Sequence, residues 1–231
     1  GSLVAADLAT AGAGKDLAAA QAPAVLPLAG DRRLLVFAVG HPSGGIPADW
    51  AASDDRAGLA LTPDLSRAGA LALGRRIEAA ARPGDVVVVS VHWGGNWGYD
   101  VPDEQREFAH VLIEEAGVDV VHGHSSHHPK AIEVHEGRPI FYGCGDFLND
   151  YEGIRGHEAF RPDLTLMYLP SLRDDGSLDA LAMVPLRIAR FRLHHADADD
   201  ARWLAETLDR ECARHGGGVA LQEDGTLSLR W

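Results

Sequence analysis

Two valine-rich segments that end in histidine constrain this chain more than any other feature. The first, DVVVVSVHW, has valine at five of the six positions from 86 to 91 and leads into His92. The second, VDVVHGH, leads into His122 and His124 about thirty residues later. Short, continuous apolar runs of this kind are typical of strands buried on both faces of a sheet. They predict an α/β fold built around a central sheet.

Further segments predict the elements around these strands. RRLLVFAVG, residues 32–40, reads as another buried strand, and residues 63–84 read as an amphipathic helix that stops at Pro83-Gly84. Residues 102–117 predict a second helix that ends at Gly117. AIEVHEGRPIFYGCGD predicts two strands joined by a tight turn at Glu136-Gly137. The segment HPSGGIPADWAASDDRAG lies between the predicted strand at 32–40 and the predicted helix at 63–84. It is a long polar loop for which we expect a functional role.

The chain divides into a core and an addition. Residues 1–163 contain the alternating strands and helices. Residues 164–231 predict a β-meander, one amphipathic helix and a terminal hairpin around Asp224-Gly225. We expect this second part to pack on the same domain as the first.

The charge of the chain argues against one class of partner, although a metal or a local basic pocket could still bind a polyanion. The formal net charge is -13, whereas nucleic-acid binding depends on lysine and arginine that neutralise phosphates. We therefore expect no nucleic-acid partner. No apolar run approaches the roughly 20 residues that a membrane helix needs, so no membrane span is predicted. The sequence leaves the localisation and the oligomeric state open.

The histidine segments predict one site. HGHSSHHPK contains four histidines within seven residues, and PIFYGCGD places Asp146 after another predicted strand. In open α/β sheets, ligands bind beyond the carboxyl ends of strands. Each residue alone is more often structural, but together they predict a site formed by His92, His124, His127 and Asp146.

The same residues carry a resemblance to a known family. A strand that ends in His-Trp-Gly, then a helix, then Gly-His-x-x-His-Pro and then Pro-Ile-Phe-Tyr-x-x-Gly-Asp-Phe resemble the CapA family of poly-γ-glutamate capsule synthesis. This family is part of the calcineurin-like metallophosphoesterase superfamily. The resemblance covers about residues 11–150. It implies a layered α-β-β-α sandwich and a metal site with His92, His124 and His127 as ligands and Asp146 behind them.

Two departures from the superfamily change that expectation. The blocks Asp-x-His, Gly-Asp-x-x-Asp and Gly-Asn-His are absent, so the chain resembles the C-terminal two-thirds of a longer fold. Asp146 also stands where many family members have asparagine. Since the site is rich in imidazole and poor in carboxylates, we expect at most one divalent ion, Zn, Mn or Fe, because two ions need carboxylates between them.

The resemblance leaves three functions open. The first is a metal-assisted, hydrolase-fold enzyme acting on a peptide or a poly-γ-glutamate-type substrate. The second follows from HGHSSHHPK and YGCGDFLNDYEG, which resemble the metal-independent epimerase of lasso-peptide biosynthesis; histidine and aspartate would then remove and return a Cα proton. The third is a non-enzymatic protein of capsule assembly that binds polymer.

Overall fold

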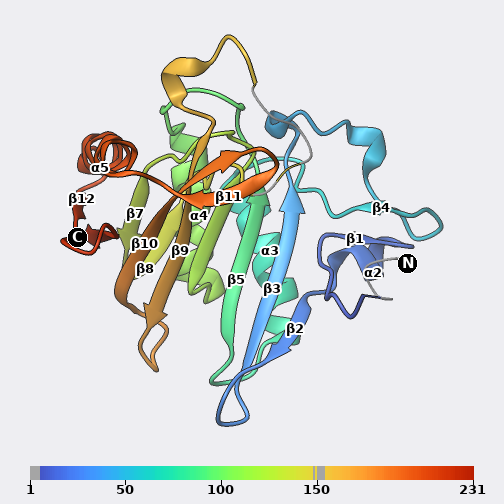
Figure 1. The fold of residues 1–231 in the computed structure, drawn as a ribbon. Coiled ribbons are helices and arrows are strands. Elements are labelled where there is room, and N and C mark those ends of the chain that lie inside the picture. Colours follow the sequence, from blue (N-terminus) through green and yellow to red (C-terminus); the bar gives the residue numbers. More distant parts are fainter. Residues whose placement is uncertain (1–5, 148, 150–153) are drawn as a thin grey trace. The chain divides into compact units, whose positions relative to one another are not determined.

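The computed structural model describes residues 6–147, 149 and 154–231. The chain forms two compact units, and Figure 1 shows the helices and strands that they contain. The first comprises residues 1–94 and 102–123, and the second comprises residues 95–101 and 124–231. The structure combines helices, a parallel strand pair and antiparallel strands, which confirms the α/β class. The predicted division at residue 163 stays a prediction.

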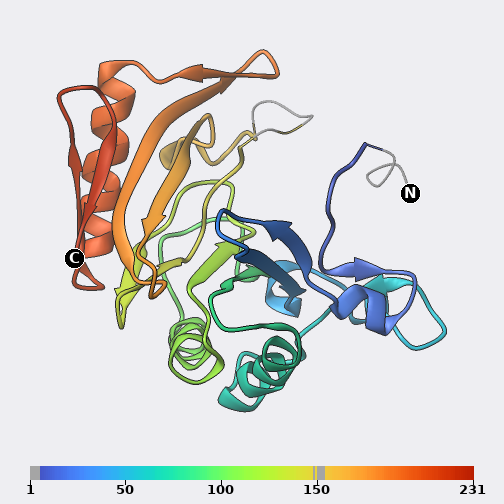
Figure 2. The same cartoon turned by 90° about the horizontal axis from the view of Figure 1, so that it is seen from below.

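The first unit contains most of the predicted core elements. They are β1 (Ala13–Gly14), α2 (Leu17–Gln21), β2 (Ala24–Pro27), β3 (Arg33–Gly40), η1 (Pro42–Gly44), η2 (Ala48–Trp50), β4 (Gly58–Leu59), α3 (Arg67–Ala80), β5 (Val86–His92), α4 (Asp103–Ala116) and β6 (Val120–His124), whose last residue belongs to the second unit. The strand order is β2-β3-β5-β6. Strands β3 and β5 run parallel, with Gly40 opposite His92. Helices α3 and α4 lie side by side (Figure 2).

Local sequence signals explain where these helices begin and end. The side chain of Ser66 accepts a hydrogen bond from the amide of Gly69 and caps α3. Gly117 ends α4 in the left-handed conformation, as its sequence position predicts. Strand β5 alternates between buried Val89 and Val91 and half-buried Ser90 and His92. The half-buried positions of β5 include the candidate site residue, His92.

The second unit is mainly antiparallel. It contains β7 (Ile132–His135), β8 (Arg138–Phe141), η3 (Glu158–Phe160), β9 (Leu164–Leu172), β10 (Leu178–Ala189), β11 (Arg192–His195), α5 (Ala198–Ala213), β12 (Gly218–Leu221) and β13 (Leu227–Arg230). Strands β11, β10, β13 and β12 follow one another in a sheet, and β9 also pairs with β10. Helix α5, capped by Asp197, contacts β12 and β10 (Figure 2).

Strand β10 exchanges partners along its length, and a proline lies at the exchange. Ala182 and Met183 pair with β13, whereas residues from Leu186 onward pair with β11. Pro185 lies between the two stretches. Because proline has no amide hydrogen, it fits where a ladder of hydrogen bonds is interrupted. No helix of the described part of the chain has both the length and the apolar character needed to cross a membrane.

Candidate active site

A tight turn sets the geometry of the candidate site. Strands β7 and β8 are antiparallel, with His135 opposite Arg138 and Ile132 opposite Phe141. The two residues between them, Glu136 and Gly137, both have positive φ, 47° and 74°. This is the conformation of a two-residue hairpin turn, which fixes the strand register.

The register of this hairpin continues beyond the two strands. The amide of Tyr142 donates to the carbonyl of Ala131, and the amide of Lys130 donates to the carbonyl of Gly143 at 2.8 Å. Pro129 and Cys144 then form an antiparallel bridge. In the same register, His127 lies nine residues before the turn and Asp146 nine residues after it. The hairpin therefore places the two side chains opposite each other.

The carboxylate of Asp146 holds the ring of His127. His127 Nδ1 lies 3.0 Å from one carboxylate oxygen of Asp146 and 3.1 Å from the other. A carboxylate only accepts hydrogen bonds, so Nδ1 carries the proton and donates it. In the neutral ring, Nε2 then keeps its lone pair for a proton or a metal ion. Asn149 Nδ2 donates to Asp146 Oδ2 at 3.1 Å, and the amide of His127 donates to the carbonyl of Asn96 at 3.0 Å.

Two glycines allow the segments to approach. A Cβ atom at Gly143 would collide with Ser126 Oγ and would lie 2.9 Å from the side chain of Lys130. Gly145 has a φ of +73°, which side chains rarely adopt. The Gly-Cys-Gly-Asp sequence therefore has a structural purpose, because it lets the strand that carries Asp146 pack against the histidine loop.

Aromatic rings and further imidazoles surround His127. The ring of Trp97 lies 5.3 Å from that of His127 and stacks on His157 at 4.0 Å with an interplanar angle of 8°. Phe160 stacks on His128 at 4.8 Å. His128 is fully buried, and this burial lowers the pKa of its imidazole to about 4. His128 is therefore a neutral packing residue, whereas His127 remains about one-fifth exposed.

Asp146 also borders a cavity of about 560 Å³ in the second unit. This volume lies within the usual range of small-molecule sites, roughly 300–1,000 Å³. The lining is rich in charged side chains, among them Arg155, Glu158, Arg161 and Arg187. Asp146 thus connects His127, through its hydrogen bond, to a space that can hold a ligand.

His92 has a different environment in the first unit. Its Nε2 atom lies 3.1 Å from the carbonyl oxygen of Gly44 in the predicted functional loop. In that loop, His41 Nδ1 lies 2.7 Å from Ser43 Oγ, and this hydroxyl accepts a hydrogen bond from the amide of Gly94. Burial lowers the pKa of His41 and that of His122, whose Nδ1 lies 3.0 Å from Ser90 Oγ.

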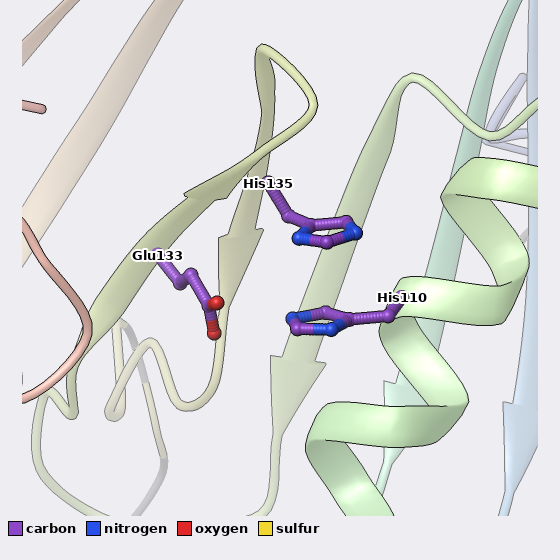
Figure 3. Close-up of side chains that lie close together, drawn as sticks. All are labelled: His110, Glu133 and His135. Carbon is purple, nitrogen blue, oxygen red and sulfur yellow. The ribbon is translucent and has the colours of Figure 1, made fainter.

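Three more side chains are of types that bind metal ions. Glu133 and His135 lie on β7 and project to the same side of it, and His110 lies on α4 of the first unit (Figure 3). In the second unit, the buried carboxylate of Glu133 accepts a hydrogen bond from the hydroxyl of Tyr142 at 2.6 Å. His215 Nδ1 lies 3.7 Å from the same carboxylate.

The structure thus brings His127 and Asp146 together. His124 ends β6 and is half-buried, and His92 ends β5 of the other unit. A joint metal site on His92, His124 and His127 stays a prediction. Trp97, His157 and the arginines of the cavity were not among the predicted site residues. Only the adjacency of Trp97 to the His-Trp-Gly motif could have pointed to one of them.

Comparison with known proteins identifies the family of the chain. The chain matches the family described as bacterial capsule synthesis protein PGA_cap over residues 1–151. It is 45% identical over 230 residues to a probable polyglutamine synthesis accessory protein of Mycobacterium tuberculosis. That match covers 98% of this chain and 60% of the relative, so the chain spans about three-fifths of its length.

Two relatives of the CapA type match over shorter segments. The PGA biosynthesis protein CapA of Bacillus subtilis is 40% identical over 83 residues, which are 36% of this chain and 22% of that protein. The capsule biosynthesis protein CapA of Bacillus anthracis is 30% identical over 134 residues, which are 56% of this chain and 29% of that protein.

The mixed α/β fold and the match over residues 1–151 define a protein of the CapA type. The chain belongs to the PGA_cap family of bacterial capsule synthesis proteins, as the resemblance predicts.

Proposed function

We propose that this chain acts in bacterial capsule synthesis on a glutamate polymer or peptide, and that the His127–Asp146 pair transfers the proton. The family match and the names of the relatives support the capsule role. The observation that carries the chemistry is the hydrogen bond between His127 Nδ1 and Asp146 at the edge of the 560 Å³ cavity.

The pair has the parts that general acid–base hydrolysis needs. His127 Nε2 takes a proton from a water molecule while the water oxygen bonds to the carbonyl carbon of an amide. The carboxylate of Asp146 keeps the ring oriented and stabilises the imidazolium that forms. When the carbon–nitrogen bond breaks, His127 returns the proton to the leaving amine. The products are a carboxylic acid and an amine, and the pair is restored.

A divalent ion would use the same atom of the same ring. Asp146 behind His127 is the arrangement that orients a metal-ligating imidazole, so His127 itself has the form of a ligand. His127 would hold it through Nε2 together with His124, and His92 is the third predicted ligand. The bound ion would polarise the carbonyl oxygen. Elemental analysis of the chain purified without chelator should find at most one equivalent.

The test is turnover of a γ-linked glutamate oligomer, followed by mass spectrometry and by the release of new amines. We expect His127→Gln and Asp146→Asn to lose activity, and the exposed His194→Gln, in the same unit, to keep it. The same assay in heavy water tests the other functions. Deuterium at Cα without chain shortening would replace hydrolysis by epimerisation. If the wild-type chain gives neither shortened oligomer nor deuterated Cα, the polymer-binding alternative is left.

A further inference from the structure

Four arginines surround the cavity beside the His127–Asp146 pair, although the chain as a whole is strongly acidic. They are Arg155, Arg161, Arg187 and Arg190. The lining also contains three carboxylates, Asp146, Glu158 and Asp163, so its guanidinium groups outnumber its carboxylates by one, whereas the chain as a whole has a net charge of -13. Arginine presents planar donors that match the geometry of a carboxylate. This composition therefore points to an anionic ligand.

Two of the arginines are held in place by buried or half-buried aspartates. Arg161 Nη2 lies 2.7 Å from Asp200, and Arg161 Nε lies 3.0 Å from Asp163. Arg187 contacts the same two carboxylates, at 3.2 Å and 3.4 Å. The side chain of Asp200 is only 9% exposed. These contacts fix the orientation of both guanidinium groups before a ligand arrives.

The other two arginines, Arg155 and Arg190, are differently placed. Both are exposed, and neither forms an ion pair or a hydrogen bond within the part of the chain that the structure describes. Of the cavity's three carboxylates, Asp146 is bonded to His127, Glu158 accepts the amide of Gly156, and Asp163 pairs with Arg161. Arg155 and Arg190 are therefore the two guanidinium groups of the cavity that no carboxylate of the described residues engages.

The backbone is strained where it carries the arginines. Arg190 and Phe191 form the two-residue turn between β10 and β11, with φ values of 54° and 57°. Such turns usually contain asparagine and glycine, because other side chains rarely adopt positive φ. Arg161 has a φ of 49° as well. Strained backbone conformations of this kind are concentrated at functional sites, where they hold a side chain in the position that the function needs.

We propose that this cavity is a carboxylate-binding subsite, in which Arg190 and Arg155 bind the free carboxylates of a glutamate polymer. Arg161 and Arg187 form its oriented wall. The inference rests on the proposed function and names the groups that hold the substrate. Because Asp146 borders the cavity and bonds to His127, a chain anchored there lies beside the proton-transferring pair. Several carboxylates in sequence would engage more than one arginine.

The test is calorimetric binding of a γ-linked glutamate pentamer to the chain. We expect Arg190→Gln to weaken binding about tenfold, and the double variant with Arg155→Gln about a hundredfold, since each charge-assisted pair contributes about one tenfold step. The matched control is Arg202→Gln, because Arg202 is an exposed arginine of α5 in the same unit that pairs with Asp199. It should bind like the wild type.

A second pair of variants separates binding from folding. Arg190→Gly and Phe191→Gly both place glycine in the strained turn, so both should raise the melting temperature by about 1–3 °C. Only Arg190→Gly should lose affinity for the pentamer. A stabilised Arg190→Gly chain that binds as tightly as Phe191→Gly would overturn the proposal.

Two further probes fix the chemistry of the ligand. A pentamer with amidated carboxylates should bind at least tenfold more weakly than the acid. Equal binding of the amide, or tighter binding of inorganic phosphate than of the pentamer, would overturn the carboxylate assignment. Binding is measured without turnover, so the two proposals fail separately. If the arginine variants keep both turnover and wild-type affinity for the pentamer, the subsite proposal is wrong. If the wild-type chain binds the pentamer tightly but does not cleave it, the hydrolysis proposal is wrong.

Discussion

Two histidines that follow buried strands differ in what holds their rings. His92 in the first unit points Nε2 at the peptide carbonyl of Gly44, whereas His127 in the second unit points Nδ1 at the carboxylate of Asp146. A carbonyl orients a ring, but a carboxylate also stabilises it when it takes up a proton. The same residue type after the same kind of strand is therefore suited to two different tasks.

The largest effect should come from breaking the carboxylate partner. Asp146→Asn keeps the size of the side chain and removes the charge that stabilises the protonated ring. We expect turnover of the glutamate oligomer to fall about 10²–10⁴-fold, the usual contribution of a positioned acid–base group. His127→Gln should lose as much, and the double variant little more, because the two residues act as a unit. Kinetic measurement of kcat for the three variants checks this.

His92→Gln tests the other half of the comparison. The glutamine amide can still donate to the carbonyl of Gly44, so an orienting contact survives. We expect turnover to fall less than about tenfold, well below the effect of Asp146→Asn. If His92→Gln and His127→Gln lose activity equally and additional zinc restores neither, the two imidazoles share one site, as the sequence predicts.

The next effect concerns the packing that positions each ring. Gly143→Ala places a Cβ against buried Ser126, whose hydroxyl donates to the carbonyl of His128 at 2.8 Å. We expect a loss of about 1–3 kcal/mol in the free energy of unfolding, as for other overpacked sites. Gly44→Ala should cost less, because its Cβ meets the half-buried ring of His92 rather than the buried side chain of Ser126. Urea unfolding measures both.

The control for these substitutions is Gly95→Ala. Its new Cβ would lie 3.9 Å from the nearest atom, the carbonyl oxygen of Trp97, and its φ is not positive. The free energy of unfolding should stay within about 0.5 kcal/mol of the wild type. A loss equal to that of Gly143→Ala would mean that the close approach at residue 143 is not the cause.

The smallest effect is acid sensitivity of the first unit. The guanidinium of Arg33 bonds to Asp85 at 3.0 Å, and this hydrogen bond holds the pKa of Asp85 below its ordinary value of 3.8. A carboxyl group with a lowered pKa in the folded state stabilises the fold above its unfolded pKa and loses that contribution as the pH falls through the folded pKa. The wild type should therefore lose stability below about pH 4, and Asp85→Asn should lose less between pH 5 and pH 3 in urea unfolding.

The sequence contained enough information to predict that His127 and Asp146 in the second unit lie opposite each other. His127 and Asp146 were both predicted site residues, and the turn at Glu136-Gly137 was predicted as well. Counting outward from a two-residue turn places the two opposite each other, because the register of a hairpin is set by its turn. A similar count was impossible for His92, since its partner Gly44 lies in an irregular loop.

Elements with little local signal were not predicted from the sequence. Strand β2, which pairs with β3, follows Pro23 and has only four residues. Its hydrogen bonds to β3 stabilise it more than its own residues do. The arginine cavity is the extreme case, because its lining combines residues near 155–163 with residues 187–190.

By itself, the sequence determined the helices with caps, the valine-rich strands, the family and the hairpin that joins His127 to Asp146. These depend on hydrophobic periodicity, glycine conformation and turn geometry, all of which act over a few residues. Tertiary structure alone decided that Arg161, Arg187 and Arg190 line one cavity. That arrangement depends on the long-range pairing of β9 with β10, and on a strained turn that a local preference for glycine would not select.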